Sequence, residues 1–469
     1  MNYLSQIVLG VFSTLSFADL PLPFEADVAT VRKTLTEMVA ADTTNPPGNE
    51  ARVVKIIAQR LKEASIPYEI TEFAPGRENI TARLKAVTPS TGGKGTKPLL
   101  LLAHIDVVGT QDQPWTTDPL KVTEKDGYLY GRGVSDDLGM AAINLEVFIQ
   151  IKKSGVRLKR DLILAMTGDE ESAGAGIQYI LAKHPQQLDP EIVINEGGSP
   201  ELGDNGKVKL VAMQAAEKIY QDYQITATGP TGHSSVPHAD NAIYRLSRAL
   251  DRLGKTERPA RLIPVTRGYF ERRAGLETPA MAKAFTALAK AKTTLPKAAL
   301  REIEKDLGLK SLLRTTCVAT IIKGGTKENA LPPEAHAVVN CRILPDETIA
   351  GTQAWLTQVV ADAKIEIKPV GEMGAAEASD VKGELPTAVE KIAQEMWPGA
   401  PVIPAMFGGA TDSRYLRAKG IAAYGLNPIA MLKSDSRRAH GIDERIPLAS
   451  IRPGLEFLHR LVSELAVGK

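Results

Sequence analysis

Cysteine, histidine and aromatic residues are scarce in this sequence. Its 469 residues include two Cys and seven His, and the aromatic residues make up 5%. Two cysteines exclude a disulfide-rich scaffold and a Cys-rich zinc module, so a metal ion would depend on His and carboxylate ligands. The 57 Lys and Arg nearly balance the 55 Asp and Glu, and the net charge of +2 gives no general field to attract nucleic acid or an anionic membrane.

Long apolar runs are lacking beyond the N-terminus, so we expect no stable membrane insertion. Residues 7–18 read IVLGVFSTLSFA, which is shorter than the roughly 20 residues that cross a bilayer. The run suits a secretory signal, and we expect residues 1–18 to be a signal peptide of a periplasmic or secreted protein. It lacks a preceding Lys or Arg, and the alternative is an N-terminal segment of a cytoplasmic protein.

The length is too great for one ordinary core. Single domains stop growing near ~250 to 300 residues, so we expect two domains or one domain with a large insertion. With 43% hydrophobic and 24% charged residues, 39 Gly and 30 Pro, the chain is globular and rich in loops.

Short apolar runs alternate with helical patterns in residues 19–216. PLLLLAHIDVV begins at Pro98, DLILAMTGDEE at Asp161 and EIVINEGG at Glu191, while 139–155 reads as a helix. This alternation predicts an α/β fold, with a mixed, largely parallel sheet and helices on both faces. Ligands of such sheets bind beyond the C-terminal ends of the strands.

The pattern changes near residue 217. Residues 217–371 follow a β-α-β-β-α-β order, which is typical of a ferredoxin-like α+β module, with a helical insertion at about 257–313. The α/β pattern returns in 372–469. We therefore predict one α/β domain, formed by 19–216 and 372–469, that is interrupted by the ferredoxin-like module.

Histidines and carboxylates follow the predicted strands. His104 and Asp106 lie on the same side of a strand end, where Asp106 can orient a metal-binding imidazole. Asp136 and Asp137 occupy a Gly-rich turn before a helix. Taken alone, an ordinary strand end or a helix cap explains each of these pairs.

Further acidic residues follow two other strands. Glu170 and Glu171 lie in GDEE, where one carboxylate can bind metal while its neighbour acts as a base. Glu196 lies in NEGG, and His440 lies in a late loop. Each is unremarkable alone, but together they converge on one edge of the sheet. Two His, several carboxylates and no Cys suit zinc, and a shared carboxylate suits two metals.

The motifs resemble, in order, those of the zinc-dependent exopeptidase and deacylase family. This family includes aminoacylase, acetylornithine deacetylase, succinyl-diaminopimelate desuccinylase and Gly-Xaa carboxypeptidase. The resemblance begins at TTNPPGNE, runs through AHIDVV, GRGVSDD, GDEE, NEGG, GPTGHSSVPH and GGATDSR, and ends at AHGIDERI, over about residues 30–460. The turn DDLG departs from the family, which commonly has Lys after the second acid.

The resemblance implies two Zn²⁺ per chain, which Co²⁺ or Mn²⁺ can replace. One zinc would be held by His104, Asp136 and Glu196, and the other by Asp136, Glu171 and His440. Asp106 would orient His104, and Glu170 would be the general base. The inserted module would be a lid and dimerisation domain, from which His233 polarises the scissile carbonyl, in some relatives across a homodimer interface. Asn329, Arg342 and Arg414 would bind the substrate carboxylate.

From these roles we expect a zinc-dependent metallopeptidase of the exopeptidase type. It would cleave amide bonds next to a free carboxylate, as a carboxypeptidase or dipeptidase on short peptides. The alternative is an aminoacylase-like deacylase of N-acyl amino acids, and a more distant one is a non-catalytic metal-stabilised binding protein.

The other histidines and the cysteines have weaker assignments. We expect His184, His238, His336 and His459 to be surface or packing residues. Cys317 and Cys341 fall on the two strands of one predicted hairpin, so they can form a cross-strand disulfide if the protein is exported. The alternative is a pair of free thiols.

Overall fold

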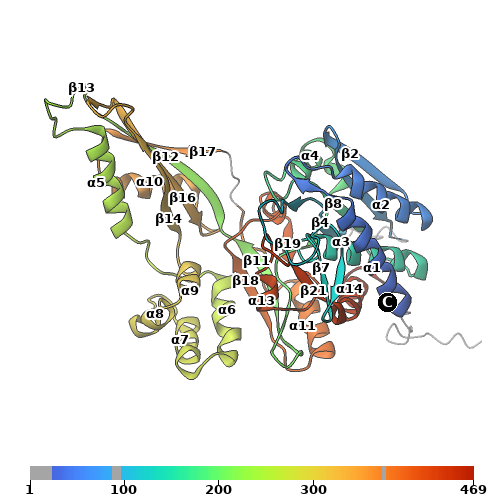
Figure 1. Cartoon of the computed structure of the whole chain (residues 1–469). Helices are drawn as coiled ribbons and strands as arrows, with labels where there is room; N and C mark the ends of the chain where they lie inside the picture. Colours follow the sequence, from blue (N-terminus) through green and yellow to red (C-terminus); the bar gives the residue numbers. More distant parts are fainter. Residues whose placement is uncertain (1–23, 87–96, 372–375, 469) are drawn as a thin grey trace, which may run out of the picture.

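The computed structural model describes residues 24–86, 97–371 and 376–468, so the predicted signal peptide at 1–18 lies outside the described residues. This chain forms a large and a smaller sheet, and strand β11 of the first leads directly into β12 of the second (Figure 1). Within the described residues, every helix is too short or too polar to cross a membrane.

In the described chain, ten strands form the large sheet. Nine follow the order β2 (Tyr68–Ala74), β3 (Arg77–Leu84), β8 (Leu162–Thr167), β4 (Leu99–His104), β9 (Ile192–Asn195), β19 (Ala422–Gly425), β11 (Val208–Glu217), β10 (Pro200–Leu202) and β20 (Met431–Leu432), and β18 (Val402–Phe407) pairs with β11. The central strands β8, β4, β9 and β19 are parallel, while β2, β3 and β11 make antiparallel pairs. The mixed sheet confirms the predicted fold class.

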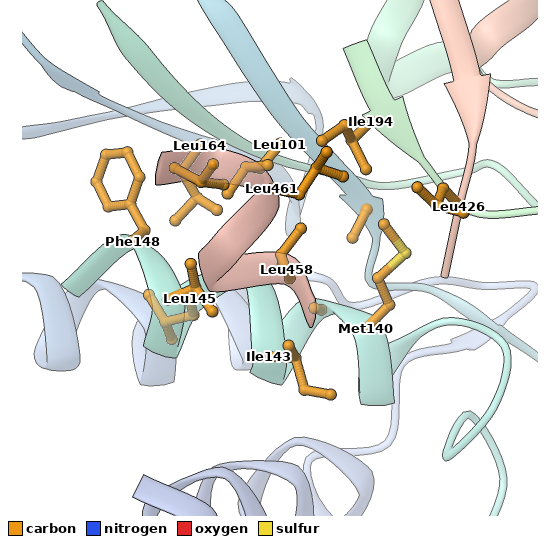
Figure 2. Close-up of a cluster of buried hydrophobic side chains, with 14 of the residues drawn as sticks. Leu101, Met140, Ile143, Leu145, Phe148, Leu164, Ile194, Leu426, Leu458 and Leu461 are labelled. Atoms are coloured by element: carbon orange, nitrogen blue, oxygen red, sulfur yellow. The ribbon is translucent and has the colours of Figure 1, made fainter. Parts of the chain in front are cut away.

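Helices cover both faces of this sheet, which explains the continuous apolar strands. Leu101, Leu164 and Ile194 point to one face, where Figure 2 shows them near side chains of α3 and α14. Their neighbours Leu100, Ile163 and Val193 belong to the cluster on the other face. The first face packs against α1 (Phe24–Ala40), α2 (Ala51–Glu63), α3 (Leu138–Ser154), α11 (Glu384–Met396) and α14 (Ile451–Ala466), and the second against α4 (Ala175–Lys183) and α12 (Ser413–Arg417).

The smaller sheet has its own core. In the described chain its order is β14 (Thr316–Gly324), β16 (Glu334–Ile343), β12 (Ile219–Thr228) and β17 (Ile365–Val370), all antiparallel, with α5 (Ala242–Lys255) and α10 (Ile349–Val360) on one face. The chain order and strand order are those of a ferredoxin-like module. We call residues 219–370, without the helical insertion, the lid. At its far end β13 (Gly232–His233) pairs with β15 (Ala330–Leu331).

The helical insertion contacts the large sheet as well as the lid. It contains α6 (Pro264–Arg273), a 3-10 turn (Ala274–Leu276), α7 (Pro279–Lys290), α8 (Lys297–Ile303) and α9 (Leu307–Leu312). Phe270, Phe285 and Leu288 form its core. Val265 of α6 joins the main core, and Arg272 donates to the carbonyl of Val402 at 3.0 Å. Figure 1 shows α6 beside β18, with α7 and α8 farther out.

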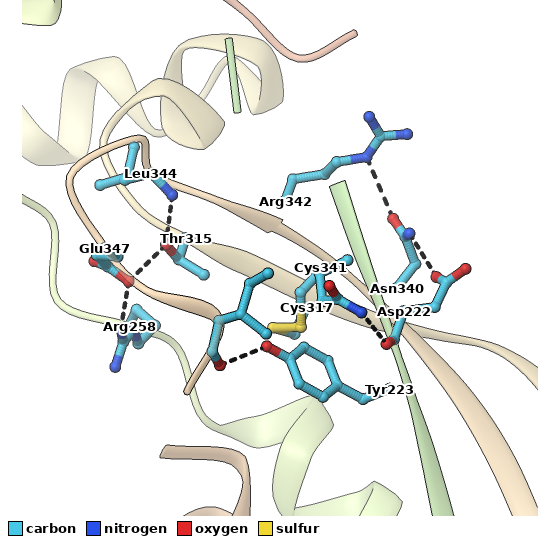
Figure 3. The surroundings of a disulfide bond; sticks show 12 residues. Asp222, Tyr223, Arg258, Thr315, Cys317, Asn340, Cys341, Arg342, Leu344 and Glu347 are labelled. Atoms are coloured by element: carbon cyan, nitrogen blue, oxygen red, sulfur yellow. Dashed lines mark hydrogen bonds and ion pairs between the residues drawn. A yellow bond between two sulfur atoms is a disulfide. The ribbon is translucent and has the colours of Figure 1, made fainter. Parts of the chain in front are cut away.

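Cys317 and Cys341 form a disulfide between β14 and β16, as the sequence allowed (Figure 3). The two residues are directly paired across the strands. The bond therefore ties the edge strand β14 to the strand that carries Arg342.

Shorter elements border the large sheet. They are β1 (Thr44–Asn45) paired with β5 (Val107–Val108), the small sheet of β6 (Thr123–Lys125), β7 (Tyr128–Tyr130) and β21 (Arg445–Pro447), helix α13 (Lys433–Ser436), and 3-10 turns at Pro185–Gln187 and Leu448–Ser450. Because β21 pairs with β7, the late loop that contains His440 lies next to the turn that contains Asp136.

Candidate metal centre

Three parallel strands end at one edge of the large sheet, and acidic residues or histidine follow each of them. His104 is the last residue of β4 and pairs with Thr167, the last residue of β8. Glu170 and Glu171 follow β8, and Glu196 follows β9. The parallel arrangement brings these side chains together, as the sequence predicted.

Asp136 lies between two imidazoles at the centre of this cluster. Its Oδ1 is 3.0 Å from Nε2 of His104, and its Oδ2 is 3.2 Å from Nε2 of His440. The same nitrogen of His440 is 2.9 Å from Oε2 of Glu171. One carboxylate thus contacts both histidines that the sequence assigned to metal binding.

Asp106 connects His104 to the acidic loop after β8. Nδ1 of His104 is 2.9 Å from the backbone carbonyl oxygen of Asp106 and 3.6 Å from its Oδ1. The Asp106 carboxylate also accepts hydrogen bonds from the backbone amides of Glu170, at 3.0 Å, and Glu171, at 3.2 Å. Asn45 donates to it at 2.8 Å. Asp106 therefore fixes the imidazole mainly through its carbonyl, and fixes the two glutamates through its carboxylate.

The donor atoms fit metal ions. Two groups each have ligand atoms within 4.8 Å of one another, namely His104, Asp136 and Glu171, and His104, Glu170 and Glu196. Among the described residues, Oε1 of Glu171 is buried without a hydrogen-bond partner. Imidazole and carboxylate donors in such a group suit zinc and similar divalent ions. Glu170, which we assigned as the base, lies within reach of the same positions.

The cluster concentrates negative charge in a buried region. Burial raises the pKa of Glu170 and of Glu196 well above the usual range, and neighbouring carboxylates add to both shifts. Burial also opposes ionisation of Asp136, but the hydrogen bonds from His104 and His440 outweigh it and lower the pKa of its carboxyl. Hydrogen bonds to Asp136 and Glu171 raise the pKa of His440 to about 10. The environment therefore favours cations.

Glu444 is a supporting residue to which the sequence analysis assigned no role. Its buried carboxylate accepts from Nη1 of Arg132 at 2.7 Å, from the amides of Gly133, Ser135 and Asp136 at 3.1, 2.8 and 3.1 Å, and from the Ser135 hydroxyl at 3.0 Å. A single side chain from the end of the chain thus holds the turn that presents Asp136.

Arg132 extends this support to the loop of His440. Its Nη2 donates to the carbonyl of Gly441 at 3.0 Å and to Oε1 of Gln113 at 2.9 Å. Gln113 in turn donates to the carbonyl of His440 at 3.1 Å. Glu444 and Arg132 therefore set Asp136 and His440 relative to each other, although more than 300 residues separate them.

The residues predicted to bind the substrate carboxylate occupy two regions. Arg342 lies over the ring of Tyr220 and donates to the carbonyl of Gly408, at 2.7 Å. Arg414 lies over the ring of Tyr415, which follows it in α12. These two arginines come from opposite sides of the junction between the lid and the large sheet.

His233 and Asn329 lie elsewhere. The amide of Ser234 donates to the carbonyl of Asn329 at 3.0 Å, so both residues belong to the far end of the lid. Figure 1 shows this end, at β13, well away from the large sheet. Within one chain, the structure does not bring His233 or Asn329 to the metal cluster, and their roles stay predictions.

The remaining histidines lie outside the cluster. His459 is buried in α14, where burial lowers its pKa to about 4. His184 packs near the ring of Tyr179, with 5.7 Å between ring centroids. His336 lies on β16, and His238 is exposed near the far end of the lid.

A cluster of histidines and carboxylates that could hold metal ions thus lies at the strand ends of a mixed α/β sheet, which carries a ferredoxin-like insertion. Residues 100–464 match the model of peptidase family M20/M25/M40. The chain belongs to this family.

Several proteins are similar to this chain over most of its length. Human N-fatty-acyl-amino acid synthase/hydrolase PM20D1 is 28% identical over 78% of this chain and 74% of its own length. Aminoacylase-1 of Dictyostelium discoideum is 23% identical over 84% of this chain and 88% of its own. The crystal structure of an M20 family metallo-carboxypeptidase from Sulfolobus solfataricus has a TM-score of 0.65 and 17% identity, and covers 92% of this chain and 98% of that one.

The support from Glu444 leads to a prediction about metal affinity. In Glu444→Gln, the NH2 group of the new side chain would face backbone N–H groups that now donate hydrogen bonds to the carboxylate. Arg132 would also lose its buried counter-charge. We expect the dissociation constant for zinc to rise by about 10- to 100-fold, measured by competition with a chromophoric chelator.

The matched control is Asp362→Asn in the lid. It breaks a partly buried pair with Arg245, whose Nη1 lies 2.7 Å from Oδ1 of Asp362. This variant should lose thermal stability but keep its zinc affinity. Zinc affinity of Glu444→Gln within twofold of the wild type would show that Glu444 does not position the ligands.

Proposed function

We propose that this protein is a dinuclear zinc hydrolase that cleaves the amide bond next to a free carboxylate, and that it removes the C-terminal residue of short peptides. The observation that carries the proposal is the position of Asp136, whose two carboxylate oxygens each contact a different histidine. A carboxylate shared in this way suits two metals about 3.5 to 4 Å apart.

The proposed ligands divide into two sets that share Asp136. His104 and Glu196 complete one set, and Glu171 and His440 complete the other. Zinc ions held by these residues would supply Lewis-acid chemistry, which would polarise an amide carbonyl and lower the pKa of a water toward neutral pH. Co²⁺ or Mn²⁺ would support the same chemistry, because these ions accept imidazole and carboxylate ligands.

Glu170 is the proposed general base. Its backbone amide is fixed by Asp106, and its carboxyl group lies among the ligand atoms of His104 and Glu196. A carboxylate in this position suits a group that must take a proton from water and then return it to the leaving amine nitrogen.

Arg342 and Arg414 are the proposed carboxylate-binding groups. A guanidinium can form two parallel hydrogen bonds with a carboxylate. The aromatic rings of Tyr220 and Tyr415 lie against these guanidinium groups, which limits their rotation. A substrate whose carboxylate is blocked would lose this interaction.

The alternative function is hydrolysis of N-acyl amino acids. Such substrates present the same amide bond and the same free carboxylate, and two similar proteins are named as an N-fatty-acyl-amino acid synthase/hydrolase and an aminoacylase. The two functions differ only in the group on the other side of the amide.

A substrate panel tests these proposals together. We expect hydrolysis of dipeptides with a free C-terminus, loss of activity after treatment with a chelator, and recovery with zinc. The C-terminal amides of the same dipeptides should be cleaved at least about tenfold more slowly, because they cannot pair with the arginines. Faster cleavage of N-acyl amino acids than of every dipeptide would favour the alternative, and no chelator-sensitive hydrolysis at all would contradict both.

Glu170→Gln separates chemistry from metal binding in the same assay. Loss of the base should lower kcat by about 10² to 10⁴. The variant should still contain two zinc ions per chain. Turnover near the wild-type rate with both metals bound would exclude Glu170 as the base.

We further propose that the protein is a homodimer in which the lid of one subunit supplies His233 to the other. The strand β14 is an edge of the lid sheet and has no partner strand on its outer side among the described residues. Its side chains Val318, Ile321 and Ile322 are 60%, 49% and 61% exposed. An exposed apolar edge strand favours pairing with another chain. Pairing with a second copy would also explain why His233 lies far from the metal cluster of its own chain.

Subunit complementation tests this arrangement. His233→Ala and Glu170→Gln should each be nearly inactive alone. When the two are co-expressed, each mixed dimer contains one site with both residues intact, so about one quarter of the wild-type activity should return. Adding Ile322→Glu to both chains should abolish this recovery. Full activity of His233→Ala alone, or no recovery in the mixed sample, would contradict a contribution in trans.

We also propose export from the cytoplasm. The apolar N-terminal run supports it, and so does the cross-strand pair of Cys317 and Cys341, because disulfides persist in oxidising compartments.

A further inference from the structure

The positive charge of the chain is concentrated in the helical insertion. Residues 257–313 contain 12 Lys and Arg against 6 Asp and Glu, whereas the whole chain has a net charge of only +2. Between Glu277 and Glu302 there is no acidic residue. This interval contains the basic residues Lys283, Lys290, Lys292, Lys297 and Arg301. The near-neutral total therefore conceals a local excess of positive charge, which whole-chain arithmetic cannot reveal.

These five residues lie on α7, α8 and the loop between them, which we call the cationic hairpin (279–303). All five are exposed, and among the described residues none has an ion-pair partner. Lys283 and Lys290 are seven residues apart and share one side of α7. Phe285 and Leu288, which face the core of the insertion, occupy the opposite side. The charges therefore point outward.

Other basic residues of the insertion differ in this respect. Arg261 pairs with Asp346 at 2.6 Å, and Arg258 pairs with Glu347. Arg272 pairs with Glu390. These cations attach the insertion to the rest of the protein. The cations of the hairpin have no such structural use, which leaves them for a partner of opposite charge.

An apolar feature accompanies this charge. A shallow groove of about 510 Å³ runs beside Lys283, and small or apolar side chains dominate its lining: Ala274, Gly275, Ala282, Lys283, Thr286 and Ala287. Leu276, which directly follows the groove residue Gly275, is 44% exposed. A surface that combines phosphate groups with accessible hydrocarbon would satisfy both the lysines and these apolar groups.

A phospholipid bilayer presents that combination, whereas a nucleic acid does not match it. Single-stranded nucleic acids bind exposed aromatic side chains by stacking, but the single aromatic residue of the hairpin, Phe285, is buried. Lysines near an anionic membrane surface are attracted individually, and their contributions accumulate. Figure 1 shows α7 and α8 at the outer end of the insertion, where they can approach a flat surface.

We propose that the cationic hairpin docks the protein on anionic phospholipid bilayers. The lysines contact lipid phosphate groups, and Leu276 and the groove beside Lys283 contact the boundary of the acyl chains. The contact is peripheral, and it holds a hydrolase of peptides or N-acyl amino acids at a membrane surface without a spanning helix.

Vesicle sedimentation with the full chain tests the proposal. The protein should sediment with vesicles of phosphatidylglycerol and phosphatidylcholine but not with pure phosphatidylcholine, and about 0.5 M salt should release it. The triple variant Lys290→Glu, Lys292→Glu, Lys297→Glu should bind the anionic vesicles at least about tenfold more weakly. Its thermal stability and its turnover of a soluble substrate should remain at wild-type values.

The matched control reverses three exposed lysines on other helices, Lys62, Lys153 and Lys183. This control should bind vesicles like the wild type, apart from a small loss shared by any change in net charge. Equal weakening of both triple variants would show a general charge effect and would overturn docking by the hairpin. Wild-type binding by the hairpin variant, equal binding to phosphatidylcholine, or binding to duplex DNA in place of vesicles would also contradict it.

Discussion

The structure of the site depends on the accumulation of carboxylates around Asp136. Asp136, Glu170, Glu171 and Glu196 converge in a largely buried space with two histidines. Charges of one sign repel strongly where water is excluded. Burial is the main cause of the raised pKa values of Glu170, Glu196 and Asp412, the last at about 7, and repulsion between neighbouring carboxylates adds to each shift. Divalent cations would offset the repulsion between the carboxylates, so this arrangement favours metal binding.

A rigid frame is needed to hold such a repulsive set together. The Asp106 carboxylate accepts hydrogen bonds from the backbone amides of Glu170 and Glu171. The Glu444 carboxylate accepts hydrogen bonds from backbone amides of the turn before α3. These bonds act on the backbone, so the ligand side chains keep their oxygens free for cations. The same frame connects distant parts of the chain, because Glu444 follows the late loop that carries His440. Ligand geometry and the closure of the α/β domain around its insertion therefore depend on the same contacts.

Sequence reasoning could place the candidate ligands at one edge of the sheet because their positions follow from local rules. Apolar runs locate the strands, and parallel strands bring their C-terminal residues to one edge, which places His104, Glu171 and Glu196 together. Glu444 could not be assigned in this way. It lies in the quoted motif AHGIDERI, but its partners are about 310 residues earlier, and no local pattern reports such a contact. The net charge of the chain does not reveal the cationic hairpin, because it averages over surfaces that never meet.

Motifs alone could not predict where the lid lies relative to the metal cluster. The sequence located the strands of the ferredoxin-like module and the pair of cysteines, because alternation and hairpin spacing are local signals. It could not show that His233 lies at the far end of the lid, because the distance from lid to cluster depends on how two cores are joined. The sequence also did not show that α6 packs on β18. Through this contact the helical insertion connects the lid to the large sheet.

The central claim is that one carboxylate serves two metal positions, and metal content measures it most directly. Mass spectrometry of purified protein should find two zinc ions per chain in the wild type, about one in Glu171→Ala, and none in Asp136→Ala. This ordering follows because only Asp136 belongs to both proposed ligand sets. An Asp136→Ala protein that retains two zinc ions, or a wild-type protein that binds a single ion under zinc excess, would contradict the account.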